Sequence, residues 1–313
     1  TTADGSTDNT FIGHNAGSGN WTTATSNYNV GIGSGVMLGA MYGAGENIGI
    51  GYSALAALTT GDGNIALGFQ SGDAITSESN ITLLGHRAGS AINNAAANGT
   101  VAVGKDALTA LTSGIGNVAI GANALDANET SDYNVAIGQD SLGALTVDGS
   151  ANNVAIGHSA GLTLTVGASN ILIGRNALKL AAVGESHNIA IGQDAMSGVV
   201  EGTNSSSGVN QADGNIAIGT DALTGGTFGS SSDSTDRILL GNIAIGTNAL
   251  NSTSTNPQTG TIAIGHDALT ALTAGTGNLA IGYQALDATG TGSYNIAIGQ
   301  SSCGALPNSS QKN

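Results

Sequence analysis

The stretch Asn278-Leu279-Ala280-Ile281-Gly282-Tyr283-Gln284-Ala285-Leu286 contains the phrase that decides the fold. Its first five residues recur along the chain as Asn, Ile or Val, Ala, Ile and Gly. Sixteen copies are present, and consecutive glycines of the phrase are most often 17 residues apart. Such self-similarity predicts a repeat architecture in which each unit buries its apolar side chains against its neighbours. The repeat glycines are Gly13, Gly33, Gly51, Gly68, Gly85, Gly104, Gly121, Gly138, Gly157, Gly174, Gly192, Gly219, Gly246, Gly265, Gly282 and Gly299.

Each copy of the phrase alternates large and small side chains. The residue directly before the glycine is aliphatic in all sixteen copies, and the residue three before it is aliphatic in fourteen. The residue between them is Ala in eleven copies. This period of two predicts a short strand with the two large side chains on one face and the alanine on the other. Asn stands four residues before the glycine in thirteen copies and predicts a hydrogen-bonded ladder along the stack.

The second half of the repeat reads Ala-Leu-Thr-Ala-Leu-Thr in its fullest copies, Ala107–Thr112 and Ala268–Thr273. Its i, i+3 leucine spacing suits a helix, but the stretch covers about six residues and is bounded by glycine, which favours a short strand or an irregular turn. Each coil is therefore expected to contain two short strands and two turns. The predicted fold class is all-β: a parallel β-solenoid of about 16 coils of about 17 residues.

The repeat also predicts the domain organisation. Residues 1–8 form an N-terminal junction, residues 9–303 form a continuous solenoid, and residues 304–313 form a C-terminal tail. Insertions interrupt the period, and the sequence places them at about 18–28, 199–214 and 225–240.

The insertions are candidate receptor-contact loops because loops on a rigid scaffold often carry recognition, and aromatic side chains often contact sugars. Surface decoration without function is the alternative. The candidate contact residues are Trp21, Tyr28, Asn204, Phe228 and Arg237.

Composition excludes several partner classes. The formal net charge is −15, and six Lys and Arg residues in the whole chain cannot follow a phosphate backbone, so we expect no nucleic-acid partner. No apolar run approaches the ~18 residues that cross a bilayer, so we expect no membrane insertion. The single cysteine, Cys303, occupies the column that holds Leu or Met in other coils, which predicts a small buried side chain.

No pattern of catalytic, cofactor-binding or metal-ligating residues stands out, and the abundant glycines follow the repeat. Histidines share a register but belong to coils that are not neighbours, so exposed turn positions are expected. Asp or Asn often stands two residues after the glycine, as at Asp106 and Asn123. We favour turn and ladder chemistry for this column over a calcium site. The calcium-binding Gly-Gly-x-Gly-x-Asp repeat is missing, and the sequence has no acid-dense loop. The histidines are His14, His86, His158, His187 and His266.

The alanine column suggests a self-association surface. Eleven alanines and two glycines would form a smooth stripe of small side chains, which another backbone can approach closely. A monomeric solenoid more often carries polar residues there. We therefore expect a homotrimer, intertwined or side by side, with this stripe facing the axis.

The phrase Asn-Ile-Ala-Ile-Gly resembles the head repeats of trimeric autotransporter adhesins of the YadA-like type. The longer form Asn278–Leu286 resembles repeats of phage tail-fibre proteins still more closely. The resemblance covers about Asn9 to Cys303 and implies a left-handed parallel β-roll in a trimer. The sequence departs from this pattern in its period of 17 rather than about fourteen residues, and we expect it to contain no stalk, membrane anchor or C-terminal chaperone domain.

Repeat and resemblance together predict a non-enzymatic structural and adhesive segment of an extracellular fibre. It would belong to a virion tail fibre or a bacterial cell surface, and would attach to a cell-surface glycan or protein receptor. Two alternatives stay open. An ice-binding solenoid would need a continuous threonine row, which only some coils supply. A polysaccharide-degrading solenoid would need acids facing one another across a groove.

Overall fold

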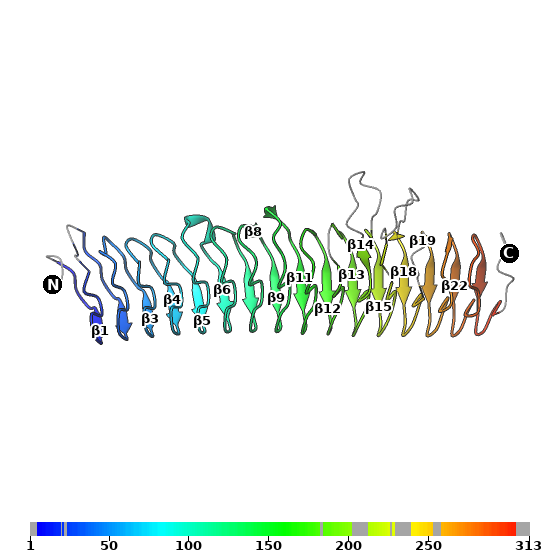
Figure 1. The fold of residues 1–313 in the computed structure, drawn as a ribbon, viewed down its shortest axis with the longest axis horizontal. Coiled ribbons are helices and arrows are strands. Elements are labelled where there is room, and N and C mark those ends of the chain that lie inside the picture. The colour runs from blue at the N-terminus through cyan, green and yellow to red at the C-terminus, as the bar shows by residue number, and fades with distance from the viewer. Residues whose placement is uncertain are drawn as a thin grey trace. The chain divides into compact units, whose positions relative to one another are not determined.

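A computed structural model gives the fold for residues 5–19, 21, 24–181, 184–201, 212–225, 227–228, 239–252 and 258–304. The chain divides between Asn152 and Asn153 into two compact units. Each unit is a parallel β-solenoid, as predicted, and each contains eight of the sixteen phrase strands. Within each unit in Figure 1 the arrows of successive strands run in the same direction.

The first unit stacks its eight phrase strands in sequence order. Their hydrogen bonds join equivalent positions of neighbouring coils, so that Ala102 pairs with Ala119 and Val103 with Ile120. The described part also contains one short 3₁₀ helix, η1 (Ala95–Ala97), and a side pair of strands, β8 (Ser131–Asp132) and β10 (Gly149–Ser150). The phrase strands are β1 (Thr10–Ile12), β2 (Val30–Ile32), β3 (Ile48–Ile50), β4 (Ile65–Leu67), β5 (Thr82–Leu84), β6 (Val101–Val103), β7 (Val118–Ile120) and β9 (Val135–Ile137).

The second unit repeats this arrangement with the same in-phase register, as where Ala244 pairs with Ala263. Its phrase strands are β11 (Val154–Ile156), β12 (Ile171–Ile173), β13 (Ile189–Ile191), β15 (Ile216–Ile218), β18 (Ile243–Ile245), β20 (Ile262–Ile264), β22 (Leu279–Ile281) and β23 (Ile296–Ile298). Its side strands are β14 (Val200–Glu201), β16 (Thr227–Phe228), β17 (Leu239–Leu240), β19 (Gln258–Thr259) and β21 (Gly275–Thr276). No helix in the described parts of the chain is long and apolar enough to span a membrane.

The repeat glycine ends each phrase strand and has a positive φ in all sixteen copies, between 122° and 145°. A Cβ placed on Gly104 would lie 2.4 Å from the carbonyl oxygen of Gly121 in the next coil. Backbone conformation and close stacking therefore both require glycine at this position.

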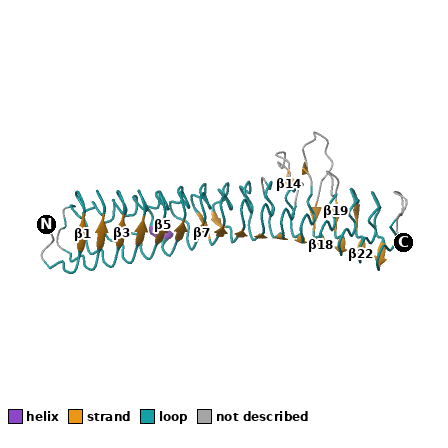
Figure 2. Ribbon diagram, turned by 90° about the horizontal axis from the view of Figure 1, so that it is seen from below, coloured by secondary structure: helices purple, strands orange, loops and turns teal. Residues whose placement is uncertain are grey.

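The Ala-Leu-x-x-Leu stretch folds as turns, so the prediction of a second strand there is wrong (Figure 2). The Ala107 amide bonds back to the Gly104 carbonyl at 3.4 Å, and the third residue of that turn, Asp106, has a φ of 56°. Asn and Asp tolerate this left-handed region better than most residues, which explains their frequency two residues after the glycine. Leu108 also has a positive φ, of 51°, and is held by an amide bond to the Ala124 carbonyl of the next coil at 3.0 Å.

The core of a coil is thin. In the coil of β6 it consists of Ala102 from the strand and Ala107, Leu108 and Leu111 from the turns, all fully buried. In the coil of β5 the strand supplies a larger residue, and the Leu108-type position is glycine. Leu83 replaces the alanine in β5, and a Cβ on Gly89 of the same coil would lie 2.7 Å from the Leu83 side chain. The two positions therefore compensate in volume within that coil. The coil of β12 differs, because it buries both Leu172 and Leu178.

The asparagine ladder is confirmed. The backbone amide of Asn215 donates to Oδ1 of Asn188 at 3.0 Å, and its Nδ2 donates to the same oxygen at 3.1 Å. Nδ2 also donates to the Leu239 carbonyl at 2.7 Å. Both asparagines are fully buried, so the ladder satisfies backbone groups that water cannot reach.

Core complementarity predicts a coupled pair of substitutions. Leu83→Ala should lower the free energy of unfolding by about 2–5 kcal/mol because it leaves a cavity. Gly89→Leu alone should lower it by about 1–3 kcal/mol because it overpacks the coil. The double variant, which has the Ala-and-Leu arrangement of other coils, should recover more than half of the Leu83→Ala loss in urea unfolding. Strict additivity of the two losses would contradict this packing.

The ladder predicts a stabilising substitution. Thr261 replaces the usual asparagine, and its buried Oγ1 has no hydrogen-bond partner, although its backbone amide donates to Oδ1 of Asn242 at 3.0 Å. Thr261→Asn should raise the free energy of unfolding by about 1 kcal/mol because the amide side chain restores the missing hydrogen bonds. The reverse change, Asn188→Thr, serves as the control in the same urea titration and should lower it. A destabilising Thr261→Asn would refute the ladder's contribution.

Candidate functional site

The first and third residues of each phrase strand point outward, and the middle residue points inward. Leu83, at the middle of β5, is fully buried, whereas the next residue, Leu84, is 47% exposed. The same alternation holds in coils with alanine in the middle: Ala66 is buried, and Ile65 beside it is exposed. The sequence correctly predicted two faces, but the expected exposed alanine stripe is wrong, because the alanines line the interior.

The outward residues form an aliphatic face on each unit, which we define as the first and third residues of every phrase strand. None of these residues is buried. The large hydrophobic members with the greatest exposure are Ile12, Ile32, Ile50, Ile65, Leu84 and Ile120 in the first unit and Ile156, Ile171, Ile296 and Ile298 in the second. Contiguous apolar surface of this kind on a soluble protein marks an interaction site. The aliphatic face is therefore the main candidate functional surface.

A second surface lies just past the ends of the phrase strands, where the residue after each repeat glycine is placed. In three consecutive coils of the first unit this residue is aromatic. The rings of Tyr52 and Phe69 stack at 5.1 Å between centroids, and those of Phe69 and His86 also stack at 5.1 Å. Tyr52 is 52% exposed and Phe69 43%.

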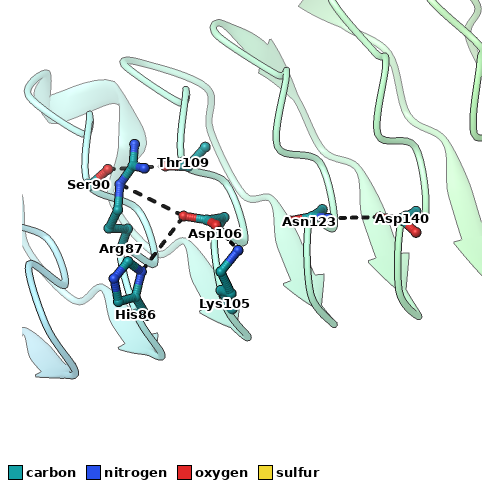
Figure 3. A network of polar contacts seen from close by, with 8 residues as sticks. All are labelled: His86, Arg87, Ser90, Lys105, Asp106, Thr109, Asn123 and Asp140. Carbon is teal, nitrogen blue, oxygen red and sulfur yellow. Dashed lines mark hydrogen bonds and ion pairs between the residues drawn. The ribbon is translucent and has the colours of Figure 1, made fainter.

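A cluster of charges continues this row (Figure 3). Nζ of Lys105 lies 2.7 Å from Oδ2 of Asp106, and Nε of Arg87 lies 3.8 Å from Oδ1. Nδ1 of His86 lies 4.0 Å from that same oxygen. One carboxylate thus faces three basic side chains that come from two neighbouring coils. Sequence reasoning missed this cluster, although the closeness of two of the six Lys and Arg residues in adjacent repeats was a usable signal.

The Asn and Asp column two residues after the glycine forms side-chain contacts from coil to coil. Nδ2 of Asn123 donates to Oδ1 of Asp140 at 2.9 Å, a contact visible in Figure 3. Nδ2 of Asn248 donates to Oδ1 of Asp267 at 3.0 Å. These bonds confirm the ladder chemistry predicted for the column. Within the described ranges, no group of three or more His, Cys, Asp or Glu residues is placed to hold a metal ion.

The five histidines are exposed, as predicted. Cys303 is exposed too, so its predicted burial is wrong. It belongs to the coil of β23, the last phrase strand, and no later described coil covers the position that Leu286 occupies buried in the coil before.

The candidate receptor-contact residues have different environments. Trp21 is only 6% exposed, and its ring packs edge-on against Phe11 at 5.4 Å between centroids. It is therefore part of the interior and is not available for a receptor. Tyr28 is 59% exposed and stays a candidate.

Each of the two larger insertions begins with a short strand, and these two strands pair with each other. Phe228 belongs to β16, which pairs in parallel with β14 so that Phe228 lies opposite Glu201. Asn204 and Arg237, the other candidate contacts, lie outside the described residues.

Two partly buried acids show raised pKa values. Burial raises the pKa of Asp73, and its own backbone hydrogen bond and the charge of Arg87 offset part of the rise. Burial likewise raises the pKa of Asp126, and the charges of Asp140 and Asp106 add to the effect. Asp106 and Asp140 both stand in the column two residues after the glycine.

Asp194 shows the opposite shift. Partial burial pushes its pKa up, but hydrogen bonds from Asn176 at 2.7 Å and Gln193 at 3.0 Å outweigh this effect. The charges of Arg175 and Lys179 act in the same direction as those bonds, so the pKa of Asp194 lies below its ordinary 3.8. A lowered pKa means that the carboxylate stabilises the fold above its ordinary pKa and that this contribution is lost as pH falls through the lowered value.

This shift predicts a pH-dependent mutational effect. Asn176→Ala should lower the free energy of unfolding at pH 6 by about 1–2 kcal/mol, since it removes a hydrogen bond to a charged group. The loss should be smaller at a lower pH, once the pH has fallen below the lowered pKa of Asp194 and the carboxylate is protonated. Urea unfolding of both proteins at the two pH values measures the difference. Asn188→Ala is the control, because its partners are amides and its effect should not depend on pH; equal pH dependence in both variants would contradict the account.

Comparison with known proteins gives no family for this chain: no protein-family model matches it, and no curated protein matches it significantly.

Proposed function

We propose that the protein is a structural and adhesive segment of a homotrimeric extracellular fibre, either a phage tail fibre or a bacterial surface adhesin. The observation that carries the proposal is the aliphatic face. Each unit presents outward two columns made mainly of Ile, Val and Leu, and a contiguous apolar surface of this kind marks an interaction site.

A second copy of the same chain fits this face best. The face is repetitive and has the same period in every copy, so identical chains placed side by side match coil for coil. A ring of three such contacts closes on itself and leaves no aliphatic face open. A face-to-face dimer would also cover the face; the choice of three follows the resemblance to trimeric adhesin and tail-fibre repeats.

The repeated core and the negative net charge support an extracellular structural role. The core is built from short, repeated contacts between neighbouring coils, which suits a stiff support that displays loops and edges. The negative charge of each chain, −15, keeps such an assembly soluble. The proposed partners are other copies of the chain and a cell-surface glycan or protein receptor, and the proposal assigns no catalytic activity.

The test of the trimer is mass and shape together. Light scattering coupled to size-exclusion chromatography should give three times the 30.2 kDa of one chain, and negative-stain images of the same peak should show a thin rod. Twice that mass would replace the trimer with a dimer. A monomer at micromolar concentration would overturn the proposal and direct attention to the ice-binding alternative, which ice recrystallisation assays test.

Two substitutions test whether the aliphatic face forms the interface of the trimer. Ile264→Glu combined with Ile281→Glu places charges on that face in neighbouring coils and should abolish the trimer while circular dichroism retains the β signal. Thr220→Glu is the matched control, since this exposed residue lies past a repeat glycine and off the face. A trimer that survives the double substitution would show that the face is not the interface.

A further inference from the structure

The row that follows the repeat glycines contains an aromatic and basic segment that the fold does not require. Tyr52, Phe69 and His86 occupy positions where several other coils have small or polar residues, such as Ser34 and Ala122, and in the first unit they are the three consecutive rings. The three rings stack on one another with interplanar angles of 13° and 8° and remain exposed to solvent. An exposed column of aromatic rings on an otherwise aromatic-poor chain points to recognition.

Basic side chains stand at one end of this column. Arg87 and Lys105 are two of only six Lys and Arg residues in a chain of net charge −15, and both are exposed. With His86 they converge on the single carboxylate of Asp106, as Figure 3 shows. Ion pairs at an exposed surface contribute little, so an incoming anion can take hydrogen bonds from Arg87 and Lys105 without disrupting the fold.

We propose that Tyr52, Phe69, His86, Arg87 and Lys105, here called the aromatic–basic row, bind an acidic saccharide. The inference rests on the proposed adhesive function and names the site and ligand chemistry within it. The apolar face of a sugar packs on the aromatic column, and its carboxylate or phosphate receives charge-assisted hydrogen bonds from the basic end. The row extends over three coil steps, about 14 Å at ~4.8 Å each, so it fits a short oligosaccharide.

The geometry leaves a ring face free for such stacking. Ser34 holds the equivalent position in the coil before Tyr52, so among the described residues the stacked ring is that of Phe69 on the other side of the tyrosine. Nucleic acid is a poorer fit, because two lysine or arginine charges on a strongly acidic chain cannot neutralise a series of phosphates.

The second unit supplies an internal comparison. His266 and Tyr283 also directly follow repeat glycines, and their rings stack at 5.5 Å between centroids. Nδ1 of His266 lies 2.8 Å from a carboxylate oxygen of Asp267. The sequence has no Lys or Arg between Arg237 and Lys312. This pair therefore has the rings, a histidine and the carboxylate, but its repeats contain no Lys or Arg, and we expect it not to bind the acidic sugar.

The experiment measures binding of defined saccharides to the full chain by isothermal titration calorimetry. The probes are oligogalacturonate and phosphorylated mannopentaose, each with a neutral counterpart: methyl-esterified oligogalacturonate and plain mannopentaose. At least one acidic probe should bind ten times or more tightly than its counterpart, and the preferred probe identifies the acid group as carboxylate or phosphate. Failure of both acidic probes to bind overturns the inference.

Variants test whether the acidic probes bind at the aromatic–basic row. Arg87→Gln combined with Lys105→Gln should weaken acidic-probe binding at least tenfold, and Tyr52→Ser should weaken it about fivefold. The matched controls Arg175→Gln and Tyr283→Ser should leave it unchanged. If Tyr52→Ser leaves binding unchanged, or if the control substitutions weaken binding equally, the attraction is a general effect of charge and the proposed site is overturned.

The same samples separate this inference from the proposed fibre. The mass of each variant is measured before titration, and all should retain the mass of the wild-type assembly. A trimer that binds no acidic probe refutes the saccharide site alone, whereas a monomeric wild type refutes the trimeric fibre whatever the titration gives.

Discussion

The close parallel stacking of the coils is the constraint on which the structure depends. Because neighbouring strands lie ~4.8 Å apart in phase, each residue meets the equivalent residue of the next coil rather than an arbitrary neighbour. The repeat glycine shows how strict this is: a Cβ on Gly104 would meet the Gly121 carbonyl at 2.4 Å. The buried asparagines use the same geometry favourably, since each side chain reaches the backbone of the adjacent coil. The chemistry of a residue is therefore set by the column of equivalent residues to which it belongs.

A thin coil has room for few large side chains. With Leu108 and Leu111 already inside, the coil of β6 accepts only an alanine from its strand. The Val and Ile residues of the strand consequently face outward, where they give the solenoid an apolar surface that it cannot bury by itself. The same lack of interior volume that fixes the core thus leaves an apolar face on the outside of each unit.

The sequence predicted the parallel solenoid, the sixteen strands and the asparagine ladder because each follows from a pattern within one repeat. It did not predict which face lies inside, since alternation defines two faces without assigning the interior to either. Two coils contain a partial signal: glycine stands at Gly17 and Gly89 where Phe11 and Leu83 replace the strand alanine, although Leu172 shares its coil with Leu178. Such compensation of volume is expected only if both positions share the core. The aromatic–basic row was harder to find, because its members lie far apart in sequence and meet only through the stacking.

The in-phase register also governs how such a chain can change in length. A duplicated or deleted segment of one whole coil keeps every remaining residue above an equivalent partner, so neighbouring coils need no adjustment. A single-residue insertion within a strand instead exchanges the inner and outer side chains from that point to the next turn. Recombination between copies of the phrase would therefore be structurally tolerated, and each event would change the number of coils by a whole unit.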